Sequence, residues 1–188
     1  MMEVILASQS PRRKELMGLL HIPFTVRVAD VDETPDPGLT AGENAVRLSR
    51  LKAEAVSRQT DDIVIAADTI VVLQDTLLGK PADAEDAKRM LRELSGQCHQ
   101  VITGLTVLQG AKCISCAVET DVCFRTLSGQ EIDAYVQSGD PMDKAGAYGI
   151  QTGGALFVEK IQGDYYNVVG LPVCRLNQIL KEIMEEPQ

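Results

Sequence analysis

The sequence predicts a mixed α/β fold, because it contains two clear kinds of segment. Stretches rich in β-branched residues, above all residues 61–73, favour buried strands. Other segments begin at a Thr, Asp or Ser cap and repeat apolar residues at helical spacing, which favours helices. The 188 residues are 45% hydrophobic and only 4% aromatic, so they fit one domain, or one domain with a small lobe, around an aliphatic core.

The most distinctive stretch is residues 61–73, which carry Asp68 in the middle of an apolar run. The run shows no alternation, so the strand is expected to be buried on both faces. An unpaired carboxylate is costly at such a place. We therefore expect Asp68 to face a cleft, where a metal ion or a proton transfer explains it. The alternative is that Asp68 ends the strand and caps a turn.

The N-terminal part predicts a short strand over Glu3–Ala7 and a loop over Ser8–Ser10. A helix should follow, with Ser10 as its N-cap, and run to about Leu20. Its expected apolar face consists of Leu16, Leu19 and Leu20.

Arg12 and Arg13 occupy the first turn of this predicted helix. The helix dipole disfavours cations there. Two guanidinium groups beside free N–H groups form an anion site that suits phosphates. The alternative is two solvated arginines on a surface helix.

Residues 29–38 are acidic and rich in proline, which predicts a loop. Carboxylates such as Glu33 are ligands that suit Mg²⁺ or Mn²⁺, although most acidic loops are simply solvated. A capping box at Thr40 then predicts a helix to about Arg58. Lys52 falls in its apolar face, so its side chain either extends to solvent or points into a pocket, and we favour the pocket.

After residues 61–73, Gln74-Asp75 predicts a turn and residues 77–78 a return strand, which Gly79-Lys80-Pro81 ends. The glycine permits close approach of a ligand, and Lys80 could bring charge to it. Asp83 should cap a helix to about Leu94, stopped by Ser95-Gly96. Its inward residues should be Ala87, Met90, Leu91 and Leu94.

The remaining elements follow from the same signals. Strands are predicted over residues 100–108, 112–118 and 120–125, and a second capping box at Ser128 predicts a helix to about Gln137. Residues 140–154 should form a long irregular but ordered segment. Strands over residues 155–161 and 168–169 and a last helix from Leu171-Pro172 complete the prediction, and the inward face of that helix should hold Leu176, Ile179, Leu180 and Ile183.

Composition excludes several classes of partner. The net charge of −9 argues against binding nucleic acid polymers or an anionic membrane through an overall field. No apolar run reaches the length of a transmembrane helix, and residues 1–6 do not form a signal peptide, so a cytoplasmic protein is expected. The odd number of cysteines, five, then predicts free thiols. Cys113 and Cys116 should point to opposite faces of a strand, which disfavours a joint metal site or disulfide.

Several motifs together closely resemble the Maf family of nucleoside triphosphate pyrophosphatases, and the resemblance covers nearly the whole chain in order. The motifs are Ser8-x-Ser10-Pro11-Arg12-Arg13, Ala67-Asp68-Thr69, Gly79-Lys80-Pro81, Leu94-Ser95-Gly96 and Asp143-Lys-Ala-Gly-Ala-Tyr-Gly-Ile-Gln151.

This resemblance implies a long, strongly twisted mixed sheet with flanking helices and a cleft between two lobes, in one domain over residues 1–188. It implies metal-dependent hydrolysis of dTTP and UTP to the monophosphate and pyrophosphate, and a homodimer. The residues it assigns are Asp68 as proton acceptor and metal ligand, Glu33 as metal ligand, Lys52 and Lys80 as catalytic cations, and Ser8, Arg12, Arg13, Thr69 and Gln151 as substrate-binding residues.

The residues themselves agree with this chemistry, because four cations fit a triphosphate and two carboxylates fit a divalent metal and an attacking water. Two rivals remain open. One is a nucleotide-sensing regulator of cell division that does not hydrolyse its ligand. The other is a nucleotidyltransferase that passes the nucleotide to an acceptor.

Overall fold

The computed structural model describes residues 3–28, 30–58 and 60–185. Ala29, where the acidic loop is predicted to begin, lies outside the described residues, as do Met1 and Met2. Seven strands are hydrogen-bonded in the order β2-β1-β3-β5-β6-β7, with β4 paired to β3. The strands are β1 Val4–Leu6, β2 Thr25–Val26, β3 Ile63–Leu73, β4 Thr76–Leu78, β5 Cys98–Gln109, β6 Lys112–Phe124 and β7 Val158–Gln162.

Helices occupy much of the remaining chain. The α-helices are α1 Pro11–Gly18, α2 Ala41–Ser57, α3 Ala84–Leu94, α4 Gly129–Gln137, α5 Tyr165–Val169 and α6 Val173–Glu185. Three short 3-10 helices are η1 Asp140–Asp143, η2 Ala145–Ala147 and η3 Gly153–Phe157. The predicted mixed α/β class is therefore confirmed. Within the described ranges, no helix is both long and apolar enough to span a membrane.

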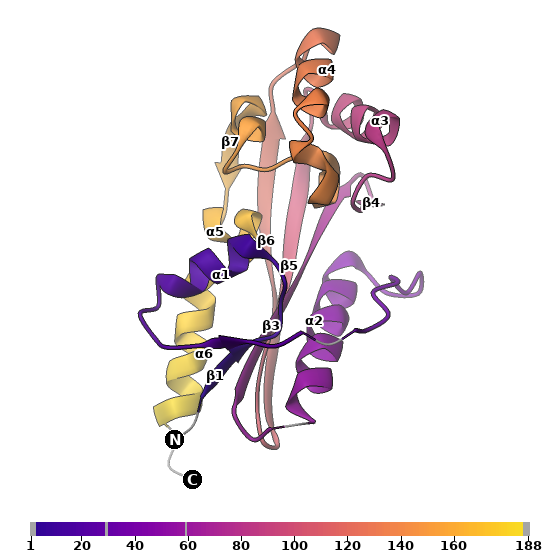
Figure 1. The fold of residues 1–188 in the computed structure, drawn as a ribbon. Coiled ribbons are helices and arrows are strands. Elements are labelled where there is room, and N and C mark those ends of the chain that lie inside the picture. Colours follow the sequence, from indigo (N-terminus) through magenta and orange to yellow (C-terminus); the bar gives the residue numbers. More distant parts are fainter. Residues whose placement is uncertain (1–2, 29, 59, 186–188) are drawn as a thin grey trace. The chain divides into compact units, whose positions relative to one another are not determined.

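The chain divides into two compact units, and β3, β5 and β6 contribute to both. The first unit comprises residues 1–68, 103–118 and 170–188. In it, β1 pairs in parallel with both β2 and β3, and α2 and α6 flank the strands on either side (Figure 1). Its aliphatic core is built on β1, α2 and β3 and contains Ile5, Ala7, Ala53, Val56, Val64, Ala66 and Leu108.

Helix α2 lies directly against the backbone of β5 at Gly104. A Cβ atom added to Gly104 would overlap the backbone of Ala45, so only glycine allows this approach. Close by, Ser49 Oγ is 2.8 Å from Thr106 Oγ1, which is 2.9 Å from Ser115 Oγ. Because buried hydroxyl groups need partners, this chain of hydrogen bonds fixes the position of α2 along the strands.

The second unit comprises residues 69–102 and 119–169. Strands β3 and β4 form a hairpin through Gln74 and Asp75, whose φ angles of 47° and 67° are those of a tight turn. Helix α3 packs against α4. The core of this unit includes an aromatic cluster of edge-to-face contacts among His99, Phe124, Tyr135, Tyr148 and Phe157.

The predicted caps are confirmed. Ser10 and Asp83 accept hydrogen bonds from the first turns of α1 and α3, and Thr40 and Ser128 form complete capping boxes. The four apolar residues predicted to face inward on α3 are buried, and so are the four on α6. These short-range patterns identify the helix starts because each cap satisfies donors within its own turn.

Four predictions about local structure are wrong. Residues 168–169 belong to α5 instead of a strand, and the two strands predicted over residues 112–118 and 120–125 are one strand, β6, over Lys112–Phe124. Residues 155–157 belong to η3, so β7 starts later than predicted. Helix α1 ends at Gly18, and Leu19 lies beyond it with half of its surface exposed.

The prediction of free thiols is right for three cysteines and wrong for two, because Cys98 and Cys123 form a disulfide. Cys113, Cys116 and Cys174 are free thiols. The pair joins β5 to β6, and its partners are 25 residues apart in sequence. Their proximity depends on strand register, which composition does not reveal.

Candidate active site

Asp68 lies within β3, and only 8% of its surface is exposed. The strand continues from Thr69 to Leu73, so the alternative that Asp68 ends the strand is wrong. Apolar residues of β3 surround it on both sides in sequence and are buried, among them Ala66, Ala67 and Ile70. A carboxylate in such a place requires a charged or hydrogen-bonding partner.

Lys52 of α2 is that partner. Its Nζ atom donates to Asp68 Oδ1 at 2.7 Å and to Glu33 Oε2 at 2.9 Å. The side chains of Lys52 and Asp68 are 14% and 11% exposed, whereas that of Glu33 is 59% exposed. One ammonium group therefore joins a buried carboxylate to a carboxylate in contact with solvent. The alternative that the Lys52 side chain extends to solvent is therefore wrong, and its position in a pocket stays a prediction.

Arg13 is fixed at the start of α1 by three oxygen atoms. Its Nε donates to Gly170 O at 2.7 Å and its Nη1 to Ser8 Oγ at 3.3 Å, while its backbone N–H donates to Ser10 Oγ. Ser8 is buried and also accepts from the Ser10 N–H at 3.2 Å. Gly170 and Ser8 thus hold the guanidinium group in one orientation.

Electrostatic interactions connect Arg13 to the carboxylates of the first unit. Loss of hydration lowers the pKa of Arg13, and the charge of Arg12 acts in the same direction, whereas Asp68 and Glu33 raise it. Arginine keeps its charge in proteins, so this environment is one of fixed positive charge. Arg12 precedes Arg13 on α1 and is half-buried.

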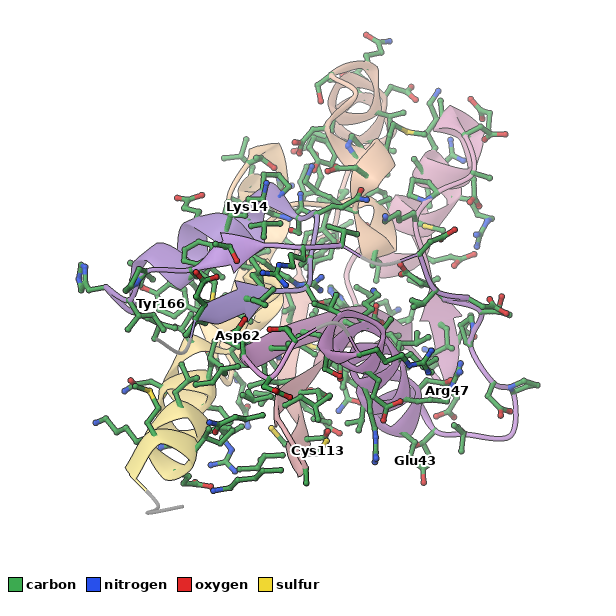
Figure 2. The ribbon with its side chains drawn as sticks, turned by 60° about the horizontal axis from the view of Figure 1, so that its bottom comes forward. Lys14, Glu43, Arg47, Asp62, Cys113 and Tyr166 are labelled. Carbon is green, nitrogen blue, oxygen red and sulfur yellow. A yellow bond between two sulfur atoms is a disulfide. The ribbon has the colours of Figure 1, made fainter. Side chains whose placement is uncertain are left out.

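The loop that carries Glu33 is attached to α2 by main-chain hydrogen bonds. The fully buried Asn44 accepts from Asp36 N at 2.8 Å and donates to Asp36 O at 2.9 Å and to Leu39 O at 3.3 Å. Arg47, which projects from the same helix as Glu43 (Figure 2), donates to Thr34 O at 2.6 Å. Sequence reasoning missed Asn44 and Arg47. An amide just inside a helix start, beside a proline-rich loop, is the signal that could have identified Asn44.

The second unit carries the other predicted residues. Thr69 follows Asp68 on β3 and is half-buried, Lys80 is exposed just after β4, and Gln151 is exposed in the segment before η3. The backbone N–H of Gly146 donates to Gly79 O at 3.1 Å, which attaches the long irregular segment next to Lys80. The structure thus places Ser8, Arg12, Arg13, Glu33, Lys52 and Asp68 in the first unit and these three residues in the second.

Asp140 organises the segment that carries Gln151. Its Oδ2 accepts from Tyr135 Oη and from Thr152 Oγ1, both at 2.5 Å, and its Oδ1 accepts from the buried Lys144 at 3.1 Å. Burial opposes the charge of Asp140, but the hydrogen bonds from Thr152, Tyr135 and Lys144 outweigh it and lower the pKa. Sequence reasoning expected order in this segment without naming Asp140 or Lys144.

The matching family model and the matching sequence relatives both cover nearly the whole chain. The family model described as Maf-like protein matches residues 3–183. A dTTP/UTP pyrophosphatase of Bacillus cereus strain G9842 is 47% identical over 183 residues, which are 97% of this chain and 96% of that protein. A protein of the same name from Bacillus anthracis strain CDC 684 is also 47% identical over the same shares of the two chains.

Solved structures show the same fold at low sequence identity. A HAM1 protein from Coxiella burnetii superimposes with a TM-score of 0.56 at 16% identity and covers 97% of this chain and 100% of that one. The Ham1 protein of Staphylococcus aureus gives a TM-score of 0.53 at 14% identity, over 96% and 99% of the two chains. At such identities the likeness describes the fold alone.

Proposed function

Because the chain belongs to the Maf-like protein family, we propose that it hydrolyses dTTP and UTP to the nucleoside monophosphate and pyrophosphate. The 47% identity to dTTP/UTP pyrophosphatases over nearly the full length supports this choice of substrates. The observation that carries the chemistry is the buried Asp68 of β3, which accepts a hydrogen bond from Lys52 of α2. Thr69 follows Asp68 on the same strand.

In the proposed mechanism, Asp68 orients a water molecule and takes its proton while the oxygen attacks the α-phosphorus. A positioned carboxylate contributes typically ~10²–10⁴-fold to such a step. Lys52 fixes the orientation of the carboxylate through its 2.7 Å hydrogen bond. Arg13, held in place by Ser8 and Gly170, presents fixed positive charge to the phosphates, with Arg12 and Lys80 as further cations.

Glu33 and Asp68 fit a divalent cation, because both already share one positive centre, the ammonium group of Lys52. The described residues contain no group of three or more His, Cys, Asp or Glu that could hold a metal. Two carboxylates are sufficient for Mg²⁺ or Mn²⁺, since Mg²⁺ commonly takes its other ligands from water and substrate phosphates. When bound, the metal would neutralise charge on the phosphate oxygens.

Thr69 and Gln151 are proposed to contact the nucleoside. The amide of Gln151 can pair with O4 and N3–H of uracil or thymine, and its exposed position leaves it available to a ligand. The proposal also includes a cytoplasmic location and a homodimer, and light scattering after size-exclusion chromatography tests the second.

The decisive experiment incubates the purified protein with Mg²⁺ or Mn²⁺ and dTTP, UTP, dCTP or 7-methyl-GTP, and measures monophosphate and pyrophosphate. We expect equimolar products from dTTP and UTP, and a ~10²–10⁴-fold lower kcat for Asp68→Asn. Asp75→Asn is the matched control, because Asp75 is exposed in the β3–β4 turn at a φ angle that Asn tolerates. Tight binding of dTTP without any product would overturn the proposal in favour of a sensor.

A further inference from the structure

Cys98 and Cys123 occupy directly opposite positions on β5 and β6. The N–H of Phe124 donates to Gln97 O at 2.9 Å. This bond places Cys98, which follows Gln97, opposite Cys123, which precedes Phe124. The Cα atoms of the two cysteines are 3.9 Å apart, and their sulfur atoms are bonded. Strand register therefore holds the two thiol positions together whether or not the bond is present.

The two sulfur atoms lie on the outer face of these strands. His99 and Phe124, the chain neighbours of the two cysteines, are buried in the aromatic cluster on the inner face. Successive side chains of a strand point to opposite faces, so the cysteines point outward. Cys98 is exposed and Cys123 half-buried. A cysteine pair on a solvent-facing surface is unusual, because free cysteine is among the most buried residue types.

A hollow of about 280 Å³ opens beside the pair, and both cysteines line it. Its other lining residues are His99, Gln100, Asp121, Lys160 and Gln162. Lys160 of β7 is the register partner of Cys123, which places a cation on the same face as its thiol. A neighbouring cation favours the thiolate, which is the form that attacks disulfides.

We propose that Cys98 and Cys123 are a reversible redox modification site that exchanges with low-molecular-weight disulfides of the glutathione type. In the oxidising direction, one cysteine thiolate attacks the small disulfide, forms a mixed disulfide and releases one small thiolate. The second cysteine then attacks the protein sulfur of the mixed disulfide and releases the other. Two cysteine thiols are oxidised and one small disulfide is reduced to two thiols, so electrons and protons balance.

The other three cysteines provide internal controls. Cys113 and Cys116 are both on β6, three residues apart, and therefore point to opposite faces. Cys174 is exposed on α6 without a bonded partner. A small disulfide can cap such a thiol but cannot convert it to an internal bond.

The test equilibrates the full chain with glutathione and glutathione disulfide at a series of ratios, then alkylates free thiols and maps peptides by mass spectrometry. We expect an internal Cys98–Cys123 bond that forms and disappears with the ratio. In Cys98→Ser, Cys123 should instead carry glutathione, whereas Cys174→Ser should leave the internal bond unchanged. Capping of Cys174 while Cys98 and Cys123 stay alkylatable would overturn the proposal, as would a bond that excess glutathione never reduces.

Thermal unfolding gives a second measurement. The bond closes a loop with a sequence separation of 25 residues, so oxidation should raise the melting temperature by roughly 6–12 °C. The Cys98→Ser protein should melt at one temperature under both conditions. Equal melting of oxidised and reduced wild type, with the bond shown by mass spectrometry, would contradict the expected stabilisation by the bond between β5 and β6. None of these measurements uses nucleotide hydrolysis, so their outcome is independent of the proposed function.

Discussion

The Nζ atom of Lys52 lies 2.7 Å from Oδ1 of Asp68, and both side chains are almost completely enclosed. Neither charge has enough water around it to remain stable alone. Removal of one partner from a buried ion pair leaves the other charge uncompensated, and that cost exceeds the net contribution of the pair. The two residues should therefore be inseparable in stability as well as in catalysis.

Lys52→Met should lower both stability and activity. Methionine keeps the apolar stem but removes the ammonium group, so we expect the free energy of unfolding to fall by about 1–3 kcal/mol. The kcat/KM for dTTP should fall ~10²-fold or more. Urea unfolding and steady-state kinetics measure the two effects. Lys14→Met is the control, because Lys14 is exposed on α1 (Figure 2).

A double variant separates the two effects of Lys52. In Lys52→Met with Asp68→Asn the buried charge is gone, so much of the lost stability should return while activity stays low. If the double variant lost more free energy of unfolding than the two single variants lose together, the ion pair would not be the source of the coupling.

Glu33→Gln should change the response to metal more than the fold. Its side chain is 59% exposed and its ion pair with Lys52 is open to solvent on the Glu33 side, so the melting temperature should stay within a few degrees. The Mg²⁺ or Mn²⁺ concentration for half-maximal activity should rise several-fold, because one of two proposed ligands is lost. The measurement is a metal titration at saturating dTTP, with Asp75→Asn, in the exposed β3–β4 turn, as the control. An unchanged titration would place the second ligand elsewhere in the acidic loop.

Gln151→Ala should reduce discrimination between bases. A flipped Gln151 amide would match cytosine, so the discrimination also depends on the donor-only guanidinium of Arg12, which suits O4 but not the amino group of cytosine. One mismatched polar contact costs ~1–3 kcal/mol, so wild type should prefer dTTP and UTP over dCTP by roughly 10–100-fold in kcat/KM. The variant should lose most of this ratio, with little change in melting because Gln151 is exposed. Equal wild-type rates on dCTP and dTTP would refute the contact to the base and leave the pyrophosphatase chemistry intact.

Gly104→Ala should destabilise the first unit. The added Cβ would overlap the backbone of Ala45, so α2 must shift and the free energy of unfolding should fall by about 1–3 kcal/mol or more. Activity should fall as well, since α2 carries Lys52. Gly129→Ala is the matched control, because its Cβ would meet nothing within 4 Å and it should be neutral or slightly stabilising. Equal stability of Gly104→Ala and wild type would show that α2 does not depend on this contact.

His99 should make stability fall in weak acid. Burial lowers the pKa of His99 from 6.5 to about 4, and its Nε2 is 2.7 Å from Tyr148 Oη. As pH falls below 6.5 the unfolded chain takes up a proton that the folded chain does not, so stability present above pH 6.5 is lost toward pH 4. Between pH 7 and 4.5 the loss from His99 alone should be about 2 kcal/mol.

The matched variant for His99 is His99→Gln, which keeps a polar group for Tyr148 but does not titrate. Urea unfolding of both proteins at a series of pH values isolates the histidine, since the carboxylates titrate alike in the two. Parallel curves for wild type and variant would contradict a neutral, buried His99.

The residues that sequence analysis placed well are those whose partners are near in the chain. Thr40 and Ser128 satisfy N–H groups of their own helices, so their patterns identify α2 and α4 without tertiary information. Val168 and Val169 show the opposite case. Their β-branched side chains favour a strand, but the adjacent Asn167 donates to Val101 O at 3.0 Å and Thr120 Oγ1 at 2.9 Å. Residues 165–169 therefore form the helix α5, although the local preference of the two valines is for a strand.

The candidate site was predictable in its residue types but only partly in its contacts. An acidic residue inside an apolar strand identified Asp68, and a lysine inside an apolar helix face identified Lys52. The hydrogen bond between Lys52 and Asp68, and the second one from Lys52 to Glu33, could be seen only in the structure. The role of Gly104 could not be predicted, because a glycine in a strand does not show which element approaches its backbone.

Asn44 and Arg47 hold the loop after Glu33 through main-chain atoms alone: the N–H and C=O of Asp36, the C=O of Leu39 and the C=O of Thr34. Most amino acids supply these groups, so outward side chains of this loop other than Asp32 and Asp36, which accept from the N–H groups of Thr34 and Gly38, can be replaced while the loop keeps its course along α2. Evolution can therefore vary the charge around Glu33 one mutation at a time.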